Sequence, residues 1–212
     1  MQAVANHRAW HTECVFTLAR LPLAAIEHQV AVAAGLPLTA LPILSPGRHL
    51  DPAARLPFGF AYDFRRSCIG NGPEAFKAAK LAFGRWVPFD LGWARVANPD
   101  ARIVAGQVIA VEMQTLGLWT LNLSRIRDVA DTPTTFGFIY VTTTAHVERG
   151  EERFFIGIDP ASGDVSYELE AFSRPRHPLA ILGFPVSRTL QHRFARDSHR
   201  RMREEAPVVH QP

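Results

Sequence analysis

The sequence predicts an α+β protein in which a curved antiparallel β-sheet wraps around a long C-terminal α-helix. From residue 89 onward, apolar and polar residues alternate with a period of two in six successive stretches joined by short turn signals. After the last stretch, apolar residues recur at helical spacing at Val186, Leu190 and Phe194. Successive strands with short connections form an antiparallel meander, and a single helix that follows them can close over one face of the sheet.

The predicted strands span residues 89–97, 103–113, 117–127, 135–147, 152–159 and 164–172. In the last of them Val165, Tyr167, Leu169 and Ala171 alternate with polar residues, so we expect one face of the sheet on the core and the other in water. Asn71-Gly72-Pro73-Glu74 is typical of a helix start and predicts a helix over residues 73–86. The C-terminal helix is expected over residues 185–203.

The chain is expected to form one domain with a long N-terminal extension. Residues 1–60 are rich in proline, and we expect them to pack on the same domain, with an edge strand near residues 13–19 and a short helix at 23–34. The helix-closed sheet is expected over residues 61–205, and residues 206–212 are expected to form a disordered tail. A hydrophobic content of 47% is ample for a core of this kind.

Charge and cysteine content exclude several classes of protein. The net charge is only +3, and arginine supplies nearly all of the positive charge. The apolar stretch from Leu21 to Leu44 contains Glu27 and three prolines, which argues against a transmembrane helix. Two cysteines, Cys14 and Cys68, make no disulfide framework. No signal peptide is recognisable, so we expect a cytoplasmic protein with reduced thiols.

Glu148-Arg149-Gly150-Glu151-Glu152-Arg153 is typical of a charged β-hairpin. A two-residue turn at Arg149-Gly150 would place Val147 opposite Glu152 and His146 opposite Arg153. Glu152 would then share an apolar face with Phe154, where desolvation raises the pKa of a carboxyl group and suits it to act as an acid or to hold a polar ligand. The alternative is that Glu152 pairs with an arginine such as Arg174 at the rim of the sheet.

The other face of this hairpin would carry His146, Glu148 and Glu151. Imidazole and carboxylate groups on one face can bind a metal ion, but a charge cluster at the surface is the commoner outcome. We therefore predict no metal site and no cofactor.

Several strings, taken together, resemble a family of bacteria and plants that is catalogued as a domain of unknown function. The resemblance covers residues 69–203, although Val141-Thr-Thr-Thr-Ala145 departs from the glycine-containing turn that the family usually has before its histidine. The matching strings are Ile69-Gly-Asn-Gly72 with Phe76, Gly92-Trp93, Gly137-Phe-Ile-Tyr140, His146, Gly150-Glu-Glu-Arg-Phe154, Ala171-Phe-Ser-Arg-Pro175 and Gln191-His-Arg-Phe-Ala-Arg196.

The family is distantly similar to the helix-grip group, which includes START-like and birch-pollen-allergen-like proteins. This resemblance implies a long helix across a curved sheet and an apolar ligand cavity between the two. It implies no established activity.

We therefore expect non-covalent binding of a hydrophobic, amphipathic or lipid-like small molecule between the sheet and the C-terminal helix. A second hypothesis is a cyclase- or hydrolase-like enzyme with Glu152 and His146 as acid and base, although the sequence favours a non-enzymatic protein. A third is contact of the arginine-rich helix with nucleic acid or, peripherally, with an anionic membrane; we do not expect nucleic acid as a partner. The expected ligand-binding residues are Trp119, Tyr140, Glu152, Phe154, Tyr167, Arg174, Leu190 and Phe194.

Overall fold

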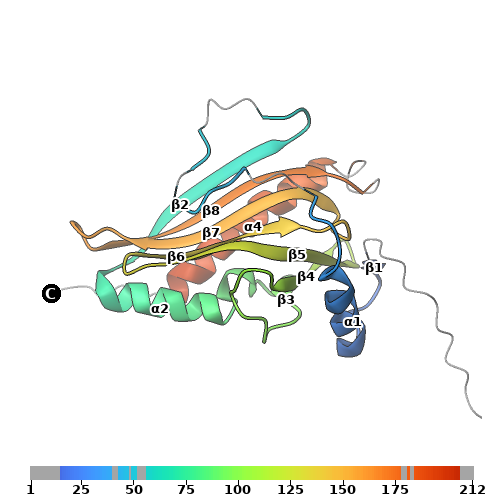
Figure 1. The fold of residues 1–212 in the computed structure, drawn as a ribbon, viewed down its shortest axis with the longest axis horizontal. Helices are drawn as coiled ribbons and strands as arrows, with labels where there is room; N and C mark the ends of the chain where they lie inside the picture. Colours follow the sequence, from blue (N-terminus) through green and yellow to red (C-terminus); the bar gives the residue numbers. More distant parts are fainter. Residues whose placement is uncertain are drawn as a thin grey trace, which may run out of the picture.

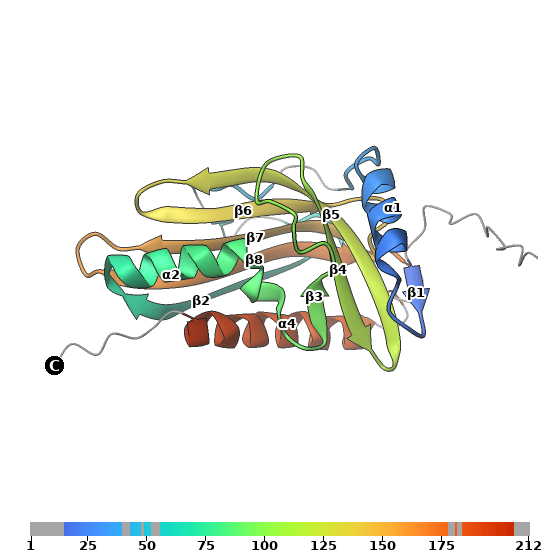
Figure 2. The same cartoon turned by 90° about the horizontal axis from the view of Figure 1, so that it is seen from below.

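The protein folds as one curled antiparallel sheet with helices on both of its faces (Figures 1 and 2). The computed structural model describes residues 15–39, 43–47, 49–51, 56–177, 181 and 184–205. Residues 13 and 14 of the predicted edge strand and the predicted tail at 206–212 lie outside this range. In chain order the elements are β1 (Val15–Thr17), α1 (Leu23–Ala33), β2 (Ala61–Asn71), α2 (Gly72–Gly84), the 3-10 helix η1 (Val87–Phe89), β3 (Ala94–Val96), β4 (Val108–Thr115), β5 (Leu118–Asp131), β6 (Thr135–Thr142), β7 (Glu148–Ile158), β8 (Asp164–Pro175) and α4 (Phe184–Glu205).

The sheet has eight strands in the order β2-β8-β7-β6-β5-β4-β3, and β1 pairs with β5 outside this path. Every pairing is antiparallel. The α4 helix runs along one side of the curled sheet (Figure 2). The predicted α+β class and its helix-grip arrangement are therefore confirmed. None of the described helices is long and apolar enough to cross a membrane.

The concave face of the sheet, which we define as the face toward α2 and α4, carries the largest core. The helix α2 begins at Gly72, whose φ of +87° suits glycine, and has Pro73 and Glu74 in its first turn. It buries Ala75, Ala79, Ala82 and Phe83. Residues two apart on β8 and β7 (Val165, Tyr167, Leu169 and Phe154, Ile156) face the same core, as the period of two predicts.

The outer face of the sheet is also covered, so the expectation that it lies in water is wrong. Helix α1 and the strands β4 and β5 bury Ile26, Ala33, Ala110, Leu121 and Leu123 there. The described residues between 43 and 60 (43–47, 49–51 and 56–60) lie over the outer face of β6, β7 and β8, where Leu44 packs with Ile139, Phe155 and Phe172. Buried polar residues also lie on this face: Glu170, fully buried, accepts hydrogen bonds from the Leu50 amide and the Tyr62 hydroxyl, both at 2.8 Å.

The predicted order of elements needs three corrections. Strand β2 was not predicted, because Asp63, Arg65 and Arg66 interrupt any apolar alternation. The predicted strand at 89–97 is reduced to β3, because Trp86 takes a left-handed conformation (φ 60°) and leads into η1. The predicted hairpin turn at Arg149-Gly150 is wrong, since both residues lie within β7 and the connection from β6 spans residues 143–147.

Candidate functional site

Six of the predicted ligand-binding residues lie on the concave face: five aromatic or aliphatic residues and Glu152. Tyr140, Phe154 and Tyr167 project from three neighbouring strands and are 5%, 0% and 0% exposed. The Phe194 ring of α4 lies 6.2 Å from that of Phe154, and Leu190 packs at the edge of the same core.

This part of the space between the sheet and α4 is filled by side chains. Phe83 of α2 lies 5.8 Å, centroid to centroid, from Tyr167, and Phe89 of η1 lies 4.9 Å from Phe154 and 5.4 Å from Phe194. Rings at these separations are in contact. The aromatic residues that were expected to line a ligand cavity therefore pack against rings contributed by α2 and η1.

Two predicted residues lie elsewhere. Trp119 shares its face of β5 with Leu121, which is buried on the outer face, and its ring lies 4.5 Å from the Arg20 guanidinium. Arg174 pairs in register with Arg149, and its guanidinium lies 5.1 Å from the Phe60 ring, also on the outer face. Neither side chain lies with the residues between the sheet and α4. The sequence pattern did not show this, because it identifies an apolar face but not the element that covers it.

Glu152 lies on the concave face together with Phe154, but its neighbour across the strands is Tyr140 and not Val147. The register places Asp63, Ala171, Glu152 and Tyr140 in one lateral row. Burial raises the pKa of Glu152 to about 7, and a hydrogen bond with Tyr140 opposes that rise. Among the described residues no arginine pairs with Glu152, so the predicted alternative of an ion pair with Arg174 is not formed.

Glu148 and Glu151 point to opposite faces of the sheet, so the predicted cluster with His146 does not form. Glu151 is fully buried on the outer face and pairs with Arg127 at 2.9 Å. Glu148 faces α4, where the Gln191 side-chain amide donates to both of its carboxylate oxygens at 2.8 Å. His146, in the β6–β7 connection, accepts the Glu148 backbone N–H at Nδ1. Within the described part of the chain, no group of His, Cys, Asp and Glu side chains is arranged to hold a metal ion.

The acid–base pair of Glu152 and His146 also gains no support. Burial lowers the pKa of His146 to about 4, and no hydrogen bond or ion pair joins it to Glu152 in the described residues. The enzymatic hypothesis therefore stays a prediction.

A polar group under the first turns of α4 was missed by the sequence analysis. The Arg188 guanidinium donates to Asp63 at 2.9 Å, and His192 lies 3.3 Å from the same carboxylate. Burial raises the pKa of nearby Glu148 above its ordinary value, which hydrogen bonds from Gln191 and Ser173 oppose. No sequence signal identified this group, because it depends on the pairing of the unpredicted strand β2 with β8.

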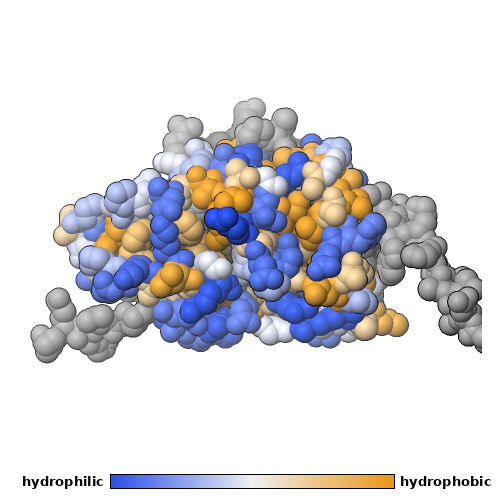
Figure 3. Space-filling model, turned by 60° about the horizontal axis from the view of Figure 1, so that its bottom comes forward, coloured by the Kyte–Doolittle hydropathy of each residue, from blue (hydrophilic) through white to orange (hydrophobic). Residues whose placement is uncertain are grey.

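Most arginines of α4 pair with acidic residues of the protein itself. Figure 3 shows this side of the molecule, on which hydrophilic residues predominate along the lower edge with apolar patches between them. Because these charges are already paired, the hypothesis of nucleic-acid or membrane contact through α4 gains no support and stays a prediction. The ion pairs are Arg188–Asp63, Arg193–Asp197, Arg196–Asp197, Arg200–Asp197 and Arg201–Asp90.

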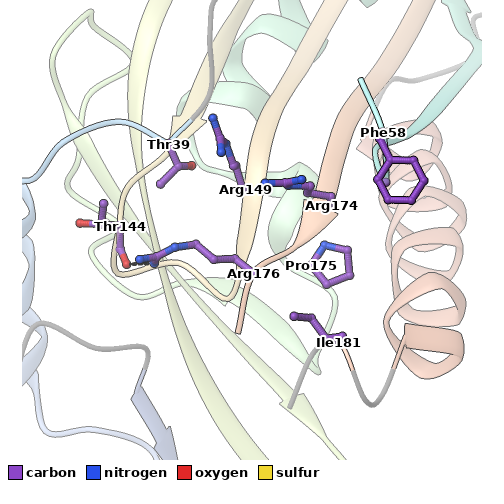
Figure 4. A pocket seen from close by; sticks show the side chains of 9 residues that line it. Thr39, Phe58, Thr144, Arg149, Arg174, Pro175, Arg176 and Ile181 are labelled. Carbon is purple, nitrogen blue, oxygen red and sulfur yellow. Dashed lines mark hydrogen bonds between the residues drawn. The ribbon is translucent and has the colours of Figure 1, made fainter. Parts of the chain in front are cut away.

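A pocket of about 750 Å³ opens where β7 begins and β8 ends (Figure 4). Its apolar lining comes from Phe58, Pro175 and Ile181, and Thr39 and Thr144 add hydroxyl groups. Arg149, Arg174 and Arg176 complete the wall. In Figure 4 the guanidinium of Arg174 extends toward Arg149, and that of Arg176 extends toward Thr144. Of the predicted ligand-binding residues, Arg174 is the one that lines this pocket.

Comparison with known proteins identifies the family. Residues 47–201 match the family model described as a domain of unknown function, DUF1990. The chain belongs to this family. The resemblance found from the sequence strings is thereby confirmed.

Relatives of this DUF1990 chain occur in Dictyostelium discoideum and in Arabidopsis thaliana. A UPF0548 protein of Dictyostelium discoideum is 36% identical over 145 residues, which are 63% of this chain and 67% of the relative. A UPF0548 protein of Arabidopsis thaliana is 31% identical over 146 residues, 66% of this chain and 70% of the relative. Among solved structures, the major latex-like protein 151 of Panax ginseng is 14% identical with a TM-score of 0.42, over 70% of this chain and 99% of that one. At this TM-score the likeness carries no information on ligand or activity.

Proposed function

We propose that the protein binds an amphipathic small molecule non-covalently, in the pocket at the start of β7 and the end of β8. The observation that carries this proposal is the pocket itself. Its volume of about 750 Å³ falls within the range of roughly 300 to 1,000 Å³ that is usual for small-molecule sites. A wall with apolar side chains on one part and hydroxyl and guanidinium groups on another suits a ligand that has both apolar and polar portions.

We propose this pocket as the binding site instead of the predicted location between the sheet and α4. There the expected lining residues Phe154 and Tyr167 are fully buried among neighbouring rings, and a ligand would have to displace them. Phe58 and Ile181, by contrast, are 97% and 55% exposed. Exposed apolar side chains beside a pocket gain free energy when a ligand covers them, at roughly 25 cal/mol per Å² of apolar surface removed from water.

Native mass spectrometry of the purified protein tests the proposal. We expect a fraction of the protein to carry a small molecule, and Phe58→Ala to lower that fraction severalfold. The substitution removes a side chain that contributes little to stability, because it is 97% exposed. Leu18→Ala is the matched control, since Leu18 is 84% exposed and does not line the pocket. Equal ligand retention in both variants would contradict the proposed site.

A further inference from the structure

Three arginines meet at this pocket, and none of them has a carboxylate partner among the described residues. Arg149 of β7 and Arg174 of β8 are direct partners in the antiparallel register, and Arg176 follows two residues after Arg174. Directly opposed residues of an antiparallel pair have Cβ atoms only about 5 Å apart, and like charges in that position destabilise the sheet. The fold therefore places two positive charges where they repel each other.

The carboxylates nearest in sequence are engaged elsewhere. Glu151 binds Arg127 and the backbone amides of Ile43 and Leu44, and Glu148 lies on the concave face with Gln191. In the part of the chain that the structure describes, no acidic residue forms an ion pair with Arg149, Arg174 or Arg176. The described acidic residues therefore do not neutralise the positive charge of the pocket.

The three guanidinium groups also have N–H donors that are available to a ligand. The Nε of Arg149 is buried and has no hydrogen-bond partner in the described part of the chain. Arg174 lies over the Phe60 ring and forms no side-chain hydrogen bond with another described residue, and Arg176 donates to the Thr144 carbonyl. A buried donor without a partner costs about 1–3 kcal/mol. An anion with several oxygen atoms would relieve both this cost and the charge repulsion.

We infer that the pocket binds a phosphate-bearing small molecule, whose phosphate is held by Arg149 and Arg174 with Arg176 at its side. A phosphate monoester carries nearly two negative charges and presents three oxygens, which match the planar donor forks of opposed arginines better than the two oxygens of a carboxylate. This inference rests on the proposed function for the apolar portion of the ligand, which would lie against Phe58 and Ile181.

Isothermal titration calorimetry with phenyl phosphate, inorganic phosphate, benzoate and benzyl alcohol tests the inference. We expect phenyl phosphate to bind most tightly, and both Arg149→Gln and Arg174→Gln to weaken it at least tenfold. Arg200→Gln is the matched control, because Arg200 is an exposed arginine of α4 outside the pocket, and it should change the affinity less than twofold. Equal binding by wild type and both pocket variants, or a preference for benzoate, would overturn the inference.

A thermal melt without ligand provides an independent measurement. Arg149→Gln removes one of two opposed like charges, so the melting temperature of the ligand-free variant should equal or exceed that of the wild type. At the same time the stabilisation by phenyl phosphate should be lost. A melting temperature lowered by several degrees would assign Arg149 a structural role and contradict the inference.

Two further comparisons separate the alternatives. Vesicles of phosphatidylcholine with and without phosphatidic acid show whether the phosphate belongs to a lipid head group or to a soluble molecule. Phe58→Ala should weaken phenyl phosphate but not inorganic phosphate. Arginine-dependent phosphate binding that Phe58→Ala leaves unchanged for both probes would support the phosphate site and contradict the amphipathic ligand. Retention of a neutral molecule that depends on Phe58 and not on the arginines would support the amphipathic ligand and contradict the phosphate site.

Discussion

Replacement of Phe154 by alanine measures how completely the space between the sheet and α4 is filled. Phe154 is fully buried, and its ring lies 4.9 Å from Phe89, 5.3 Å from Phe138, 5.5 Å from Tyr140 and 6.2 Å from Phe194. These neighbours belong to η1, β6 and α4, so they are held by three separate elements. A side chain deleted at this position leaves a void that the backbone cannot easily close.

The expected cost follows from the transfer of the ring and the cavity that remains. Phe→Ala substitutions in protein cores lower the free energy of unfolding by about 3–5 kcal/mol. At roughly 2–4 °C per kcal/mol for a chain of this size, the melting temperature should fall by about 6–20 °C. Leu81→Ala on α2, where the side chain is 61% exposed, should change the free energy of unfolding by no more than about 0.5 kcal/mol.

Urea denaturation followed by tryptophan fluorescence gives the free energies, and added benzene reports the cavity. An apolar cavity made by such a deletion stays dry and binds benzene. Benzene should therefore raise the melting temperature of the Phe154→Ala variant and leave that of the wild type unchanged. A cost below about 1 kcal/mol, or benzene stabilisation of the wild type, would refute the conclusion that aromatic side chains fill this space.

Three further predictions concern two residues of the sheet and one of α4. The folded state disfavours ionised Glu152, whose pKa is about 7 there against an ordinary 4.5. The contribution of protonated Glu152 to the free energy of unfolding is therefore fully present below pH 4.5 and is lost as pH rises to about 7. In urea titrations Glu152→Gln should become more stable relative to the wild type across that pH range, and parallel curves of stability against pH would contradict this. His199, on α4, has a pKa lowered to about 4 by burial, so its contribution to the free energy of unfolding is lost as pH falls from 6.5 to 4. In urea titrations His199→Asn should therefore show a smaller loss of stability than the wild type across that pH range. Gly150→Ala would place a Cβ 2.1 Å from the Phe172 carbonyl oxygen, so it should lower the free energy of unfolding in urea by about 1–3 kcal/mol or more. Gly157→Ala on the same strand should be neutral or slightly stabilising, because the nearest atom to its Cβ would lie 3.7 Å away. Similar losses at both glycines would show that strand propensity, and not the close approach of β8, governs the effect.

Strand β7 shows what a local sequence pattern can predict and what it cannot. Alternation alone places Glu152 and Phe154 on one face, and the structure agrees. The predicted turn failed because Arg149-Gly150 has the composition of a turn, while the glycine is needed for another reason. A side chain at Gly150 would collide with the backbone of β8, a strand that begins more than ten residues later.

Strand β2 illustrates the opposite limit. Its charged residues obscure the period of two, and its place at the edge of the sheet depends on pairing with β8, about 100 residues away in sequence. The polar group formed by Asp63 with Arg188, and the row that joins Asp63 to Glu152, could not be predicted without that pairing. The pocket arginines were also missed as a group, although Arg174 was singled out, because Arg149 and Arg174 are brought together by the pairing of β7 with β8.

The sequence by itself determined the class of fold, the succession of antiparallel strands and the closing helix, because periods of two and of about four are local properties of the chain. Only the tertiary structure decided what covers each face. It placed aromatic rings of α2 and η1 where a ligand cavity was expected, and Ile43, Leu44, Leu50, Leu56 and Phe60 over the face that was expected in water. It also set Arg149 opposite Arg174, since the register of two strands depends on their turn and on the backbone contacts between them and not on either strand alone.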